Sequence, residues 1–258
     1  MSQSRASVRQ PVFMPPVFDM ENLVANPKST DAKESRPVLE HGDRLTLAEF
    51  EKRYEAMPEL KKAELIEGVV YMPSPVRHKR HGRPNGDFVG WISFYVALTP
   101  GSDYSVNGSI RLSNKSGLQP DAMLRLLPEV GGRSQGDADD YIVGPPELVV
   151  EIAASTASYD LHDKKETYRK RGVLEYVIWR VEDRKIDWLY LTEDGQYENI
   201  IPNEEGIIES KVFPGLRLNT LAMLAGKQAD VFLELQNGLN SSEHKAFVER
   251  LIAASYSK

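Results

Sequence analysis

The sequence lacks cysteine altogether, and this absence excludes two kinds of site. Disulfide bonds cannot form, and a zinc site built on thiolates cannot be assembled. A bound metal would need histidine, aspartate or glutamate ligands, and oxygen ligands favour hard cations such as magnesium or manganese. Any metal site in this chain is therefore expected to be oxygen-rich.

Long apolar runs are also missing from the 258 residues. No segment approaches the roughly 18 apolar residues that cross a membrane, and the first residues lack the short apolar core of a secretory signal. We therefore expect a cytoplasmic protein without membrane contact. The sequence likewise has no glycine-rich phosphate loop, nucleophile elbow or internal repeat, so no motif predicts an organic cofactor.

Cations are outnumbered by anions, because 32 Lys and Arg stand against 38 Asp and Glu, for a formal net charge of -6. That balance argues against a protein that coats nucleic acid nonspecifically. An enzyme acting on nucleic acid needs only a local basic surface, and two segments are locally basic. They are 77–83, reading RHKRHGR, and 164–171, reading KKETYRKR. Phosphate contact and an ordinary solvated surface both remain open for the first.

Composition divides the chain into three parts. Residues 1–43 are rich in proline, serine and charge without sustained periodicity, which predicts a flexible tail. The 41% hydrophobic content suffices for one sizeable core, which we assign to 44–222. A helical extension follows over 223–258. Because short terminal helices rarely stand alone, this extension either packs on the core or builds a dimer contact.

Local patterns predict a mixed fold of helices and strands. Thr46 and Glu49 form a capping box at a helix start, Glu67-Gly68 marks a hairpin or a bulged strand within 63–75, and an aromatic helix containing Trp91 follows. Further strands are expected over 103–112, 118–127, 147–153, 174–179, 185–191, 197–201 and 207–213, with a mobile connection over 128–144 and helices over 220–235 and 242–254.

The stretch 145–176 organises the rest of the chain. Leu148–Ile152 is a short apolar run of buried-strand character, and Glu151 lies inside it. A buried carboxylate is costly unless a cation, a metal or a hydrogen-bonding partner accompanies it. The strand carrying Glu151 therefore predicts a partner elsewhere in the fold.

A helix is expected directly after this strand. It begins near Ser158 or Asp160, either of which can cap it, and ends before Gly172. Asp160, Lys164 and Tyr168 recur every four residues, so their side chains share one helix face. A strand bearing a carboxylate is thus followed by a helix bearing a lysine.

A second acid is expected beside Glu151. The proline of Gln119-Pro120-Asp121 turns Asp121 out of the regular ladder. If strands 118–127 and 147–153 pair as neighbours, Asp121 and Glu151 face each other. Two further residues have ordinary interpretations when taken alone: Glu64 as an exposed strand-edge charge, and His78 as a structural histidine.

Taken together, these motifs resemble a known family. The residues that carry the resemblance are ELIEG at 64–68, His78 after MPSP, QPD at 119–121, PELVVEI at 146–152, Ser155-Thr156, then Asp160, Lys164 and Tyr168, and GVLEY at 172–176. Over roughly 44–222 the pattern resembles the Uma-two family of putative restriction endonucleases, within the PD-(D/E)xK nuclease superfamily.

The resemblance implies a restriction-endonuclease-like fold of the α+β type, a mixed central sheet flanked by helices, and hydrolysis of DNA with Mg²⁺ or Mn²⁺. It implies that Asp121 and Glu151 bind the metal and that Glu64 is an additional catalytic acid. The superfamily lysine commonly follows the second acid by two residues, where this chain has Ala153. The Uma-two pattern instead takes the lysine from the next helix, which selects Lys164.

Candidate contacts to DNA lie near these residues. Neighbouring helix residues point roughly 100° apart, so Lys164 faces the site while Lys165 points to solvent or DNA phosphate. His78, Tyr168 and Arg169 complete the set of candidate substrate-binding residues. The loop at 154–156 is shorter than the family's Ser-Pro-Ser-Thr and lacks its proline.

Three interpretations of function remain open. The first is a metal-dependent DNA endonuclease, expected as a homodimer because two symmetric sites cut both strands of a duplex. The second is a nuclease-like fold kept as a DNA-binding or regulatory module. The third is a hydrolase that uses the acids as a general acid and base. Intact Asp121, Glu151 and Lys164 favour the first.

Overall fold

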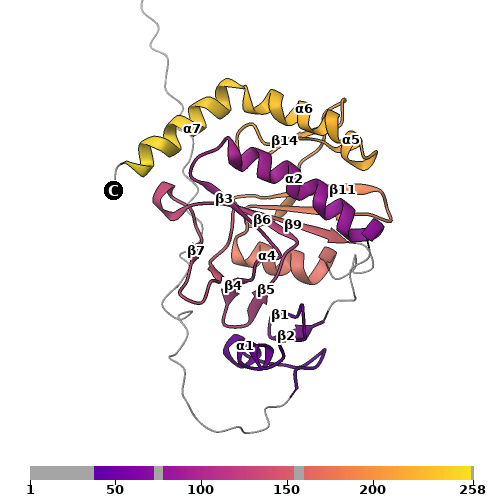
Figure 1. Ribbon diagram of the computed structural model, residues 1–258, viewed down its shortest axis with the longest axis vertical. Coiled ribbons are helices and arrows are strands. Elements are labelled where there is room, and N and C mark those ends of the chain that lie inside the picture. The colour runs from indigo at the N-terminus through magenta and orange to yellow at the C-terminus, as the bar shows by residue number, and fades with distance from the viewer. Residues whose placement is uncertain (1–37, 73–77, 154–159, 257–258) are drawn as a thin grey trace, which may run out of the picture.

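The structure, a computed structural model, describes residues 38–72, 78–153 and 160–256 (Figure 1). The tail as far as residue 37, the loop at 154–156 and the cap expected at Ser158 lie outside the described residues. Within these ranges no helix is long and apolar enough to cross a membrane.

A mixed six-stranded sheet forms the centre of the molecule, in the order β12-β11-β10-β9-β6-β3. Its strands are β3 (Ser102–Val106), β6 (Ala122–Leu126), β9 (Leu148–Ala153), β10 (Glu175–Arg180), β11 (Lys185–Leu191) and β12 (Tyr197–Asn199). β9 and β10 run parallel, and the other neighbours run antiparallel. The predicted mixed sheet and the predicted pairing of β6 with β9 are both confirmed.

A second six-stranded sheet covers part of one face of the central sheet, in the order β2-β1-β5-β4-β8-β7. Its strands are β1 (Glu64–Ile66), β2 (Val69–Tyr71), β4 (Ile110–Ser113), β5 (Ser116–Leu118), β7 (Gln135–Gly136) and β8 (Ile142–Val143). Ile66, Leu118 and Met123 pack together between the two sheets. The helix α1 (Leu47–Glu55), capped by Thr46 as expected, covers a small core of its own.

Helices enclose the central sheet from both sides (Figure 1). The helices α2 (Arg83–Ala97), α5 (Thr220–Leu224), α6 (Gln228–Leu239) and α7 (Ser242–Ser255) lie on one side, and α4 (Lys165–Arg171) lies on the other. The described residues also form the short helical turns η2 (His78–Gly82), η3 (Pro128–Val130) and η4 (Asp160–Lys164). Val231, Leu235 and Phe247 join the core beneath α2, so the C-terminal helices pack on the central domain.

Two predicted strands are each divided between the two sheets. The strand expected over 103–112 is β3 and β4, because Asn107 has a φ of 53° and turns the chain. The strand expected over 118–127 is β5 and β6, because the chain leaves one sheet at Gln119-Pro120 and enters the other after Asp121. Proline cannot donate to a ladder, which suits the break at that position.

Three other expectations require correction. The connection over 128–144 contains η3, β7 and β8, because Arg111 pairs with Val143 and holds β8 in the second sheet. The strand at 207–213 is shorter, since β13 (Ile207–Glu209) pairs only with β14 (Arg217–Asn219) in a separate sheet. The helix at 220–235 is broken near Gly226, whose φ is 71°.

Residues 38–43, the end of the predicted tail, pack against the folded domain. Leu39 is buried, and Gly42 donates a backbone hydrogen bond to the Val70 carbonyl over 2.8 Å. Arg44 forms a bridge with Val69. Residues 38–43 are therefore held against the β1–β2 hairpin, whereas the sequence analysis assigned them to the tail.

Candidate active site

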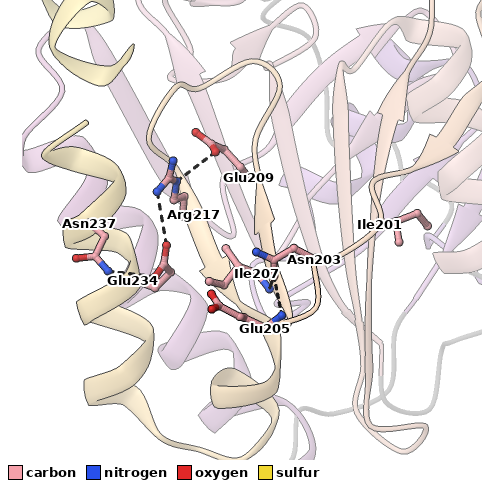
Figure 2. A pocket seen from close by; sticks show the side chains of 8 residues that line it. All are labelled: Ile201, Asn203, Glu205, Ile207, Glu209, Arg217, Glu234 and Asn237. Atoms are coloured by element: carbon pink, nitrogen blue, oxygen red, sulfur yellow. Dashed lines mark hydrogen bonds and ion pairs between the residues drawn. The ribbon is translucent and has the colours of Figure 1, made fainter. Parts of the chain in front are cut away.

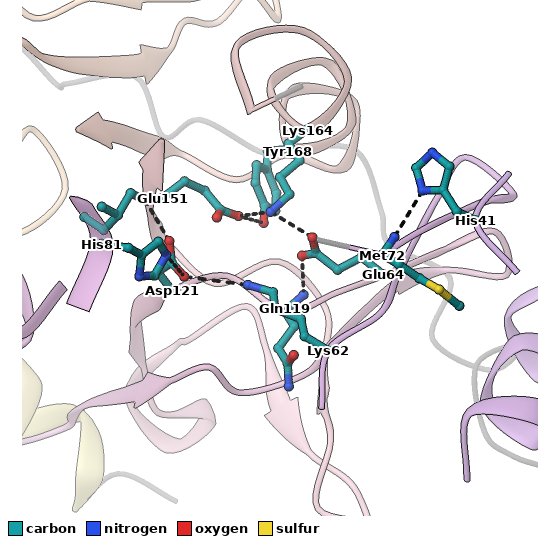
Figure 3. Close-up of polar contacts among 11 residues, drawn as sticks. His41, Lys62, Glu64, Met72, His81, Gln119, Asp121, Glu151, Lys164 and Tyr168 are labelled. Atoms are coloured by element: carbon teal, nitrogen blue, oxygen red, sulfur yellow. Dashed lines mark hydrogen bonds and ion pairs between the residues drawn. The ribbon is translucent and has the colours of Figure 1, made fainter. Parts of the chain in front are cut away.

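The candidate site lies where the central sheet, the β1 strand and the start of α4 meet (Figure 3). Asp121 precedes β6, Glu151 lies in β9, Glu64 opens β1, and Lys164 ends η4. These four side chains are all buried. The structure thus brings together every residue that the sequence analysis proposed as catalytic.

Glu151 faces α4 because of the alternation along β9. Val150 and Ile152 pack into the core beneath α2, so Glu151 between them points to the opposite face. There its Oε1 accepts hydrogen bonds from Lys164 Nζ at 2.9 Å and from the Tyr168 hydroxyl at 2.9 Å. The partner that a carboxylate in an apolar strand requires is therefore the predicted lysine, assisted by a tyrosine.

Lys164 forms the centre of an ion-pair network. Its Nζ lies 2.9 Å from Glu64 Oε2 and 2.9 Å from Glu151 Oε1, with only 2% of the residue exposed. Lys165 is only partly buried and makes no ion pair with any described residue. The predicted position of Lys164 next to Glu151 is confirmed, while its catalytic role stays a prediction.

Glu64 is held from two sides. Its Oε1 accepts a hydrogen bond from the Gln119 backbone N–H at 2.9 Å, and its Oε2 contacts the Lys164 ammonium. The residue is 1% exposed, because β1 packs between β2 and β5 beside the central sheet. The interpretation of Glu64 as an exposed strand-edge charge is therefore wrong.

Asp121 is fixed in its ionised form. Its Oδ2 accepts a hydrogen bond from the Ile152 N–H at 2.7 Å, and its Oδ1 lies 3.1 Å from His81 Nε2 and 3.6 Å from Lys62 Nζ. Burial by itself raises the pKa of this carboxyl, but His81, Lys62 and the Ile152 amide outweigh it and lower the pKa to about 2. Asp121 is therefore a carboxylate at neutral pH.

The strand register explains why the two predicted metal ligands lie close together. β6 pairs with β9 through Ala122 and Val150, so one further step along the antiparallel ladder brings Asp121 opposite Glu151. Side chains opposite each other on neighbouring strands lie on the same face. Figure 3 shows both carboxylates on the same side of these strands.

The sequence analysis missed two residues of the site, His81 and Lys62, which both contact Asp121. His81 belongs to the basic segment RHKRHGR, but His78 was the histidine selected from that segment. The structure places His78 at the exposed first position of η2, and His81 against Asp121. Lys62 follows α1 within no recognisable motif, and only the fold brings it to Asp121.

The remaining predicted DNA contacts have other neighbours. Tyr168 is fully buried, and burial beside Glu151 raises its pKa well above 10.0, so the hydroxyl stays protonated and donates to Glu151. Arg169 pairs with Glu166 through two contacts of 2.8 Å and also donates to the Gly195 carbonyl. Contact of Tyr168 or Arg169 with DNA stays a prediction.

The carboxylates of Asp121 and Glu151 suit a magnesium ion that keeps several of its waters better than they suit a metal ion whose ligands all come from the protein. Among residues 38–72, 78–153 and 160–256, no group of three or more His, Asp or Glu side chains is arranged to hold a metal. Magnesium, however, retains several waters and is commonly held by one or two carboxylates. Asp121 Oδ1 is buried without a hydrogen-bond partner of regular geometry among the described residues. Asp121 and Glu151 therefore fit as a pair of ligands.

A separate hollow of about 520 Å³ lies away from this site, between β13, β14 and α6 (Figure 2). Arg217 there lies 3.1 Å from Glu209 and 3.8 Å from Glu234, and Glu205 adds a further carboxylate. Because acids outnumber cations, this hollow does not suit an anionic polymer such as DNA.

Comparisons with known proteins identify the family of this chain. No curated protein matches the sequence. The chain is similar to a solved structure from Anabaena variabilis ATCC 29413, described as "a putative nuclease belonging to DUF820", at 12% identity and a TM-score of 0.47, covering 71% of this chain and 97% of that one. A family model described as "Putative restriction endonuclease" matches residues 47–222. The chain therefore belongs to the Uma2 family.

Proposed function

We propose that the protein is a metal-dependent endonuclease that hydrolyses DNA phosphodiester bonds. One observation carries the proposal: a buried ammonium, Lys164, lies 2.9 Å from Glu151, which shares a strand face with Asp121. Carboxylates that can hold a cation, next to a lysine, are the groups that phosphodiester hydrolysis requires. Membership of a family described as "Putative restriction endonuclease" supports the same proposal.

In this proposal Asp121 and Glu151 hold Mg²⁺, or Mn²⁺ in its place. The cation, when bound, neutralises charge on the phosphoryl oxygens and makes a bound water more acidic. The chain prepares the ligands beforehand, because the Ile152 N–H orients Asp121 and the Tyr168 hydroxyl orients Glu151. Such hydrogen bonds from fixed donors reduce the reorganisation that binding would otherwise demand.

Lys164 supplies positive charge at the same place. Glu64 and Glu151 hold its ammonium from two sides, so it stays fixed within a buried environment. From there it can orient the attacking water and stabilise negative charge in the transition state. Glu64 itself is anchored by the Gln119 amide, and we assign it the role of positioning Lys164.

Cleavage of supercoiled plasmid tests the proposal directly. The wild type should nick or linearise it with magnesium or manganese, and added chelator should stop the reaction. Glu151→Gln should reduce the rate by about a thousandfold or more, since it removes a metal ligand and the partner of Lys164. Glu175→Gln is the matched control, because Glu175 is equally buried but lies elsewhere in the sheet. If Glu151→Gln and Glu175→Gln cleaved equally well, the assignment of Glu151 to the active site would be wrong.

Calorimetric titration with magnesium separates binding from catalysis. Asp121→Asn and Glu151→Gln should weaken metal affinity, whereas Lys164→Met should largely retain it, because an ammonium is not a metal ligand. If the wild type binds DNA but never cleaves it, the protein is instead a nuclease-like DNA-binding module.

We also infer a homodimer that acts in the cytoplasm. Two symmetric sites remain the simplest way to cut both strands of a duplex. The C-terminal helices give less support than expected, because their apolar residues Val231, Leu235 and Phe247 are buried in the molecule's own core. Leu233 and Ile252 still point outward, at 58% and 40% exposure. Light scattering at micromolar concentration should report twice the mass of one chain.

A further inference from the structure

A basic groove lies beside the end of the central strand β10, outside the candidate active site. It encloses about 450 Å³ and is lined by Lys79 from η2, by Arg83 from the start of α2, and by Arg184 from the turn between β10 and β11. Trp179 and Met223 contribute apolar walls. Asp87 is the only acid among the residues that line it.

Two of the three cations remain available to a ligand. Arg83 pairs with Asp87 at 2.8 Å, whereas Lys79 and Arg184 are exposed and form no ion pair with any residue that the structure describes. The hollow in Figure 2 is the opposite case, because there Arg217 is neutralised by Glu209 and Glu234. An anionic ligand would therefore bind in the groove and not in that hollow.

The groove and the candidate active site lie near the same ends of the central strands β9 and β10, but on opposite faces of the sheet, because Trp179 packs on the α2 face whereas Glu151 faces α4. Lys79 is two residues from His81, whose Nε2 lies 3.1 Å from Asp121. On β10, Ile178 pairs with Glu151 of β9, and the next residue, Trp179, lines the groove. In Figure 1 the start of α2, the end of β9 and the β10–β11 turn lie together at the right of the molecule.

The cations of α4, by contrast, are largely occupied. Arg169 and Lys170 both pair with Glu166, and Arg171 pairs with Glu67 at 2.9 Å. Lys165 is the exception on that helix. Among the described residues, the groove therefore offers more unpaired cations near the site than α4 does.

We propose that this groove binds the phosphate backbone of DNA on one side of the scissile bond, so that the nucleic acid passes around the ends of β9 and β10, between η2 and the β10–β11 turn. The proposal rests on the nuclease function proposed above. Exposed Lys and Arg side chains bind phosphates by releasing condensed counterions, so each bound phosphate adds to the salt dependence of binding. The guanidinium of Arg184 can in addition donate two parallel hydrogen bonds to one phosphate, in bidentate geometry.

Salt-dependent binding of a fluorescent DNA duplex tests the proposal. Glu151→Gln serves as the background, so that the duplex stays intact, and Lys79→Ala is combined with Arg184→Asn. Asparagine is chosen because Arg184 has a φ of 50°, a conformation that asparagine tolerates better than alanine. The control, Lys245→Ala with Arg250→Ala, removes the same charge from exposed positions on α7.

The groove variant should bind at least about tenfold more weakly, and its slope of log affinity against log salt should be shallower by about 0.9 for each phosphate that the protein no longer neutralises. The α7 control should match the background protein. If the background binds DNA and the groove variant keeps its slope, or if the control is weakened as much as the groove variant, the groove is not the binding surface. If the background binds no DNA at all, the proposed nuclease function fails together with the groove.

Discussion

The two faces of the central sheet use the same strand for different purposes. On β9, Val150 and Ile152 face α2 and join a core that includes Trp91 and Trp188, whereas Glu151 faces α4 and meets Lys164. The face beneath α2 is rich in apolar and aromatic side chains, which stabilise the fold by leaving water. The face beneath α4 buries three acids and a lysine, which is costly unless the charges are matched. The first face maintains the fold, and the second carries the proposed chemistry.

Two buried glutamates show how acids are accommodated on these faces. Glu175, on β10, accepts hydrogen bonds from the Ser210 hydroxyl and the Lys211 N–H, each at 2.7 Å, and burial raises its pKa to about 7. Glu151 instead contacts an ammonium at 2.9 Å. Burial raises the pKa of Glu175 even though both donors oppose the rise, whereas a neighbouring cation favours the charged form of a buried acid. Only the second arrangement suits a metal ligand.

The largest effect should follow from Trp91→Ala on the apolar face. Trp91 is fully buried, touches the rings of Phe88 and Trp188, and donates its Nε1–H to the Arg217 carbonyl at 2.9 Å. The free energy of unfolding should fall by about 4 kcal/mol. Urea denaturation measures the change, and Leu233→Ala, at a 58% exposed position, should cost less than about 0.5 kcal/mol. If both variants lost the same free energy of unfolding, Trp91 would not be a core residue of the kind described.

Lys164→Met should have the next largest effect. It leaves Glu64 and Glu151 buried without the ammonium that both contact at 2.9 Å, so unfolding should become easier by about 3 kcal/mol. Adding Glu64→Gln should recover part of that loss, because it removes one unmatched charge. Denaturation of the single and double variants checks this, and a double variant that is less stable than the single one would refute the ion-pair argument.

Glu175→Gln should alter how stability depends on pH. The folded-state pKa of Glu175, about 7, exceeds its usual 4.5, so the folded protein holds the proton more tightly and loses stability as pH rises through this window. At about 1.4 kcal/mol per pKa unit, the shift from 4.5 to about 7 amounts to a loss of roughly 3 kcal/mol. The variant lacks this titration, so unfolding measured at a series of pH values should show the wild type declining relative to it. If the free energies of unfolding of the wild type and of Glu175→Gln changed with pH in parallel, the proposed titration of Glu175 would be excluded.

Lys165→Ala should have the smallest effect on stability. Lys165 is next to Lys164 but forms no ion pair among the described residues, so its removal should change the free energy of unfolding by less than about 0.5 kcal/mol. Cleavage should persist, with DNA affinity lowered a few-fold and the salt slope shallower by about 0.9 if Lys165 meets one phosphate. Loss of cleavage in Lys165→Ala, with activity kept in Lys164→Ala, would reverse the assignment.

Much of the candidate site could be predicted because its signals are local. The acid within Leu148–Ile152 and the four-residue step from Lys164 to Tyr168 depend only on strand and helix periods. The divided strands were harder to predict, because the Asn107 turn sends two short apolar runs to different sheets. His81 could not be separated from its basic neighbours, since only the docking of η2 brings one of them to Asp121.

The sequence by itself determined which residues of the strands alternate between faces, that α4 ends before Gly172, and which lysine shares a helix face with Tyr168, because these properties depend on backbone geometry over a few residues. Tertiary structure alone decided which charges meet. Glu64 and Lys164 are far apart in the chain, yet their charged atoms lie 2.9 Å apart, and Lys62 reaches Asp121 in the same way. Coulomb energies depend on separation in space and on burial, and both are set only when the two sheets and α4 pack together.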